Sequence, residues 1–127
     1  MNILLLEDSL RRIKFFKAGL QSHQLTICQH AKSAKKALKK QQFDMIFLDH
    51  DLRGRPEHPD SDNCGTEVAR YIVDYDIQCD WIILHTENAI GREAMEAELL
   101  ERCQTIPYNK LKKIGLRAIL ERIISEV

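Results

Sequence analysis

The stretch Met45-Ile-Phe-Leu-Asp-His-Asp51 decides the expected fold. Its first four residues form a continuous apolar run, which is typical of a strand buried on both faces at the centre of a parallel sheet. Three polar residues, Asp49, His50 and Asp51, follow directly. Because open α/β sheets bind ligands at the carboxyl ends of their strands, these residues are either a candidate site or a polar end to the strand.

Similar apolar runs recur along the chain and alternate with stretches of helical periodicity. The expected strands are residues 2–6, 25–28, 45–48, 81–84 and 105–108. The expected helices begin after Ser9 and Ser33, at Gly65, near Gly91 and after Asn109. Such alternation implies right-handed crossovers in a doubly wound sheet. We therefore expect one α/β domain over residues 1–127: a flavodoxin-like, three-layer sandwich with a five-stranded parallel sheet of order 2-1-3-4-5 and five helices.

Composition is that of an ordinary globular domain, with 44% hydrophobic and 30% charged residues. Lys+Arg and Asp+Glu both number 19, so charge predicts neither membrane association nor sequence-specific DNA binding. The apolar start, residues 1–6, is too short for a signal peptide or a membrane span. The four cysteines show no CxxC spacing, which favours reduced thiols and a cytoplasmic location.

The acids at two strand ends are the first candidate site. In the expected strand order, strands one and three are neighbours, so Glu7 and Asp8 should lie beside Asp49. Unpaired carboxylates at such a distance repel one another, and a divalent cation with oxygen ligands removes the conflict. The pattern predicts a site for Mg²⁺, or Mn²⁺; the alternative is that Asp8 only helps Ser9 to cap the first helix.

These strand ends resemble the receiver domain of bacterial response regulators, over essentially the whole chain. The resemblance implies that Asp49 is the phosphoacceptor and a metal ligand, and that Glu7 and Asp8 are the acid pair. It also implies that the backbone carbonyl of Asp51 is a metal ligand and that the Thr86 hydroxyl contacts the phosphoryl group.

One position departs from the receiver pattern. Receivers carry a lysine just before the proline that ends strand five, whereas here Ile106 precedes Pro107. The cation that binds the phosphoryl group is therefore missing or displaced. Arg53 and Arg55, in the long loop of residues 52–63, are the best candidates to replace it as anion binders.

Three short motifs are similar to those of a receiver-derived group, the cyclic-phosphate-processing receiver domains. They are Glu7-Asp8 after strand one, Asp49-His50-Asp51 after strand three and His85-Thr86-Glu87-Asn88 after strand four. The resemblance implies an activity on cyclic phosphates, such as those of nucleotides or RNA ends.

Opening a cyclic phosphodiester requires one group that takes a proton and another that gives one. Imidazoles are suited to this near neutral pH, so His50 and His85 are the candidate acid and base. Thr86 and Asn88 are expected to hydrogen-bond the phosphate or to position a histidine. The alternative is that the histidines are structural, with His85 buried and hydrogen-bonded to a backbone carbonyl. Because successive side chains of a strand point to opposite faces, Asp49 and His50 can both enter the site only if the strand has already ended.

Three functions are therefore compared. The first is a metal-dependent phosphoesterase that acts on a cyclic phosphate of a small molecule or an RNA end. The second is a non-catalytic pseudo-receiver that binds a protein partner. The third is a response-regulator receiver phosphorylated on Asp49, which the missing lysine before Pro107 disfavours.

Overall fold

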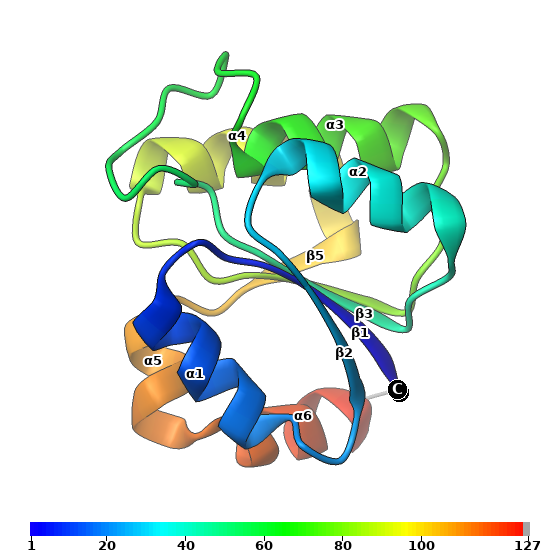
Figure 1. The fold of residues 1–127 in the computed structure, drawn as a ribbon, viewed down its shortest axis with the longest axis vertical. Coiled ribbons are helices and arrows are strands. Elements are labelled where there is room, and N and C mark those ends of the chain that lie inside the picture. Colours follow the sequence, from blue (N-terminus) through cyan, green and yellow to red (C-terminus); the bar gives the residue numbers. More distant parts are fainter. Residues whose placement is uncertain (126–127) are drawn as a thin grey trace.

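A five-stranded parallel sheet forms the centre of the molecule in the computed structural model, which describes residues 1–125 (Figure 1). The strand order is β2-β1-β3-β4-β5, as predicted. The strands are β1 (Asn2–Leu6), β2 (Gln24–Cys28), β3 (Met45–Leu48), β4 (Trp81–Leu84) and β5 (Cys103–Thr105).

Helices cover both faces of this sheet and complete the predicted three layers (Figure 1). One face packs against α2 (Ala31–Lys40), α3 (Gly65–Asp74) and α4 (Ala89–Leu99). The other packs against α1 (Leu10–Gly19), α5 (Tyr108–Ile114) and α6 (Leu116–Ser125), and a short 3₁₀ turn, η1 (Leu100–Arg102), precedes β5. Among the helices of residues 1–125, none is both long and apolar enough to cross a membrane.

The carboxyl-terminal region differs from the expected single helix. Gly115 has a φ of +98°, a conformation outside the right-handed helical region, and it separates α5 from α6. The described residues therefore contain six α-helices where five were expected. The expected apolar stripe of the last helix extended to Val127, which lies outside the described residues.

Two other boundaries also differ from the sequence prediction. The strand β5 begins at Cys103 and ends before Pro107, whose ring nitrogen has no hydrogen to donate to the sheet. Helix α2 begins at Ala31, ahead of the expected cap Ser33, whose hydroxyl donates to the His30 carbonyl. Ser9 caps α1 as predicted, because its side chain accepts from the Arg12 N–H.

The register of the central strands sets which polar side chains meet. Leu6, Leu48 and Leu84 are aligned across β1, β3 and β4. The sheet hydrogen bonds continue beyond this row, because the Asp49 N–H donates to the Leu6 carbonyl at 3.1 Å and the His85 N–H donates to the Leu48 carbonyl at 3.0 Å.

Candidate functional site

Glu7, Asp49 and His85 form one buried row across the carboxyl ends of β1, β3 and β4. They follow the aligned leucines directly, so the pleat turns all three toward the layer of α1, α5 and α6. Glu7 and His85 are 0% exposed and Asp49 is 4% exposed. One potential ligand atom from each residue lies within 4.8 Å of the others, so the row is compact.

His85 is held behind Glu7. Its Nε2 lies 3.0 Å from Glu7 Oε1, and its ring packs against the ring of Phe16 with the centroids 5.0 Å apart. Its Nδ1 is buried and has no hydrogen-bond partner among the described residues. The partner of His85 is thus a carboxyl group of the site, rather than the backbone carbonyl expected for a structural histidine.

Burial shifts the pKa values of all three groups in the direction that favours their neutral forms. Burial raises the pKa of Asp49 to about 7; His85 opposes this rise, and the Glu7 carboxylate adds to it. Burial also raises the pKa of Glu7. It lowers the pKa of His85 to about 4, although the Asp49 carboxylate favours the charged imidazole. At mildly acidic pH, Asp49 therefore keeps its proton and His85 stays neutral.

A cleft of about 330 Å³ opens above this row. Its walls contain acidic, basic and hydroxyl groups: Glu7, Asp8, Asp49, Asp51, Arg11, Arg12, Arg55 and Thr86. Asp8 stands at the rim, where its Oδ2 accepts the Gly54 N–H at 2.9 Å. The acids of the two strand ends therefore meet, and Asp8 fastens the 52–63 loop beside the cleft instead of capping α1.

His50 lies on the opposite face of the sheet from His85. Its Nε2 is 3.0 Å from Thr66 Oγ1, and it is fully buried. A Cβ at Gly91 would come within 2.3 Å of the His50 ring, so α4 can pack here only with glycine at that position. The structure does not bring His50 and His85 together, because the alternation of side chains still holds at the end of β3.

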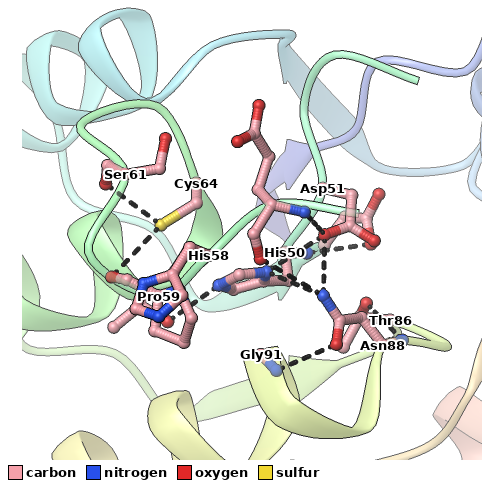
Figure 2. A network of polar contacts seen from close by, with 12 residues as sticks. His50, Asp51, His58, Pro59, Ser61, Cys64, Thr86, Asn88 and Gly91 are labelled. Atoms are coloured by element: carbon pink, nitrogen blue, oxygen red, sulfur yellow. Dashed lines mark hydrogen bonds and ion pairs between the residues drawn. The ribbon is translucent and has the colours of Figure 1, made fainter. Parts of the chain in front are cut away.

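Asp51 joins this second face to the loop (Figure 2). Its Oδ1 accepts the Glu57 N–H at 2.9 Å and the Asn88 Nδ2–H at 3.0 Å, and it lies 3.1 Å from His50 Nδ1. Asn88 also caps α4, since its Oδ1 accepts the Gly91 N–H at 3.1 Å. Each imidazole therefore contacts a carboxylate that lines the cleft: His85 contacts Glu7, and His50 contacts Asp51.

Thr86 follows the buried row and lines the cleft. Its Oγ1 accepts the Asn88 N–H at 3.1 Å, which leaves the hydroxyl hydrogen available to a ligand. Of the two arginines predicted in the loop, Arg55 reaches the cleft. Arg53 is instead paired with Glu57 and Asp62, each at 3.6 Å.

Three contributors to the site were missed from sequence. Thr66 lies in the first turn of α3 and holds His50. Glu57 carries a buried Oε1 and ties the middle of the loop to Asp51. Arg12 enters the cleft from α1. Only Arg12 had a sequence signal, because it lies three residues after the cap Ser9 and therefore one helical turn from the site.

Residues 2–101 match the family described as the cyclic-phosphate processing receiver domain. The chain belongs to this family. The expected resemblance is thereby confirmed, and the match spans the three motifs at the ends of β1, β3 and β4. A search of curated proteins finds no match.

Solved structures of receiver domains share the fold at low sequence identity. The receiver domain of Francisella response regulator 1452 is 12% identical, with a TM-score of 0.67 over 97% of this chain and 93% of that one. The receiver domain of the sensor histidine kinase PA1611 from Pseudomonas aeruginosa PAO1, which has a magnesium ion coordinated in its active site cleft, is 23% identical, with a TM-score of 0.65 over 97% and 96%.

The response regulator protein TrrA from Thermotoga maritima, in complex with Mg(2+)-BeF, is 20% identical, with a TM-score of 0.68 over 97% of this chain and 99% of that one. The chain is thus a receiver domain of the response-regulator type.

Proposed function

We propose that this receiver domain is a metal-dependent phosphoesterase that opens cyclic phosphates of nucleotides or RNA ends. The observation that carries the proposal is the cleft itself, in which acids from two strand ends face arginines from α1 and the 52–63 loop. A cation beside the acids and a phosphate beside the arginines would neutralise both walls. The family description, which names cyclic phosphates, supports the same substrate class.

The donor set fits a hard divalent cation. Asp8 and Asp49 line the cleft and offer carboxylate oxygen ligands, which Mg²⁺ and Mn²⁺ prefer. Glu7 is less suited to be a direct ligand, because its Oε2 accepts the N–H groups of Asp8 and Ser9 and its Oε1 faces His85. When bound, the cation would withdraw negative charge from the phosphoryl oxygens.

The chain would supply the proton transfers through its cleft-lining carboxyl groups. Water attacks phosphorus while the bond from phosphorus to one ring oxygen breaks, so one proton leaves the water and one reaches the departing oxygen. Glu7 with His85 behind it, and Asp51 with His50 behind it, are the two proposed dyads for these transfers. The histidines then act as positioning residues, and the Thr86 hydroxyl donates to a phosphoryl oxygen.

The test is the conversion of 2′,3′-cyclic adenosine monophosphate to a monoester, followed by ³¹P NMR with Mg²⁺ or Mn²⁺ and with chelator. We expect the monoester resonance to appear only with the cation, and a 3′,5′-cyclic nucleotide serves as the comparison for ring size. The absence of any monoester from both substrates and from an RNA with a cyclic phosphate end would contradict the proposal.

The same samples distinguish the other two functions. Stable modification of Asp49 by acetyl phosphate, without hydrolysis of a cyclic phosphate, would favour a phosphoacceptor receiver. If the protein is not modified and binds no cation, the result favours a pseudo-receiver that acts through a protein partner.

A further inference from the structure

Arg12 differs from the other arginines near the cleft because its guanidinium is held in place. It lies in the first turn of α1, beneath the Ser9 cap. Its Cζ is 4.5 Å from the centre of the Tyr108 ring, and its side chain is 20% exposed. An aromatic face at this distance attracts the cation and fixes its plane. Two elements far apart in sequence therefore place one positive charge in the cleft wall.

The hydrogen-bond donors of Arg12 remain free. Its nearest anion is Glu7, with Nη1 at 3.8 Å from Oε1. That distance allows electrostatic attraction but exceeds the range of an N–H···O hydrogen bond. Within residues 1–125 the guanidinium donates no hydrogen bond to another group. A guanidinium held at the cleft wall, whose N–H donors have no acceptor among the described residues, is arranged for an anion that enters the cleft.

The other positively charged side chains near the cleft are less suited to bind an anion there. Arg53 is occupied by Glu57 and Asp62. Arg11 and Arg55 line the cleft but are exposed, and no ion pair orients either of them among the described residues. Lys110 faces a different hollow, beside β5 and α6.

We infer that Arg12 is the phosphate-binding cation of the cleft and that Tyr108 sets its orientation. The choice of phosphate as the ligand rests on the proposed function. A guanidinium fork can donate to two non-bridging oxygens of one phosphate group. Arg12 stands beside Glu7, the neighbour of Asp49 in the buried row, so a phosphate bound to Arg12 lies next to the proposed cation ligands.

Calorimetric titration of the full chain with inorganic phosphate, in the presence of Mg²⁺, tests this assignment. We expect Arg12→Gln to weaken phosphate binding by about tenfold or more, because it removes a charge-assisted pair of hydrogen bonds. Arg12→Lys should fall between Gln and wild type, since it keeps the charge without the fork. Arg117→Gln is the matched control, because it makes the same change at an arginine of α6 that is 91% exposed and does not line the cleft, and it should change the affinity by less than about twofold.

The stacking role of Tyr108 has its own pair of variants. Tyr108→Phe keeps the ring and should bind phosphate as wild type does, whereas Tyr108→Leu should weaken binding about threefold. The Arg12 Nε–H resonance, followed by NMR during the phosphate titration, should shift in wild type and in Tyr108→Phe. Circular dichroism checks that each variant is folded.

Equal phosphate affinity in wild type and Arg12→Gln would overturn the inference, as would an equal loss in Arg117→Gln or the absence of phosphate binding in wild type. Because binding requires no turnover, the two proposals can fail separately. A chain that binds phosphate through Arg12 but never opens a cyclic phosphate contradicts the proposed activity and leaves this inference standing.

Discussion

Replacing Asp49 with Asn is expected to reduce the rate of cyclic phosphate opening by about 100-fold or more, as for other groups that stabilise charge in a transition state. Asp49 belongs to the buried row and lines the cleft beside Asp8 and Asp51. The amide is nearly the same size but cannot carry the negative charge that a divalent cation requires. Initial rates with 2′,3′-cyclic adenosine monophosphate and Mn²⁺ measure the effect.

The matched control is Asp62→Asn, which makes the same chemical change in the 52–63 loop. The Asp62 side chain is 96% exposed, and its only ion-pair contact among the described residues is with Arg53 at 3.6 Å. We expect this variant to retain the wild-type rate. Similar rates for Asp49→Asn and wild type would remove Asp49 from the reaction.

The same substitution at Asp49 is expected to stabilise the fold, and to do so more strongly as pH rises from about 4 to about 7. The pKa of Asp49 is raised from 3.8 to about 7, chiefly by burial. A group with a raised pKa contributes stability below its unfolded pKa, and that stability is lost as pH rises through the folded pKa. Asn does not ionise, so the variant avoids this loss.

The expected gain is on the order of 3–4 kcal/mol in the free energy of unfolding near neutral pH, because each pKa unit corresponds to about 1.4 kcal/mol. His85 works in the opposite direction, since its pKa is lowered to about 4 and it stabilises the fold less as pH falls below 6.5. The wild-type profile should therefore be nearly flat between about pH 4 and 6.5, where the two effects cancel.

Urea denaturation of wild type and Asp49→Asn at intervals between about pH 4 and 8 provides the test, because the difference between the two proteins isolates Asp49. This difference should grow in favour of the variant with rising pH. If the difference in the free energy of unfolding stays constant or shrinks as pH rises, ionisation of the buried Asp49 does not destabilise the fold. Asp62→Asn serves as the control, since it removes a carboxylate whose side chain is 96% exposed.

The strand pattern and the proximity of the acids were predictable, because they depend on hydrophobic periodicity and on the usual strand order of this fold. Continuous apolar runs such as residues 45–48 occur where a strand is covered on both faces, and strand order then brings Asp8 and Asp49 into one cleft. The separation of His50 from His85 requires the alternation of side chains to continue past the last residue of β3. What sequence could not show is how far beyond β3 that alternation persists.

The remaining features depend on contacts between distant residues. Arg12 meets Tyr108 across the α1 and α5 layers, and Glu57 meets Asp51 through a loop without regular structure. Neither contact leaves a periodic signal in the sequence. The break at Gly115 is different, because glycine at a helix end was a visible signal within an otherwise continuous apolar stripe.

A cation shared by Asp8 and Asp49 is the central claim, and Mn²⁺ binding measured by calorimetry tests it most directly. Wild type should bind a single Mn²⁺ in the cleft, and both Asp8→Asn and Asp49→Asn should weaken that binding by more than about tenfold, since each removes a direct carboxylate ligand. Asp62→Asn should bind Mn²⁺ as wild type does. Unchanged Mn²⁺ affinity in Asp8→Asn and Asp49→Asn, or no binding by the wild-type chain, would contradict the claim.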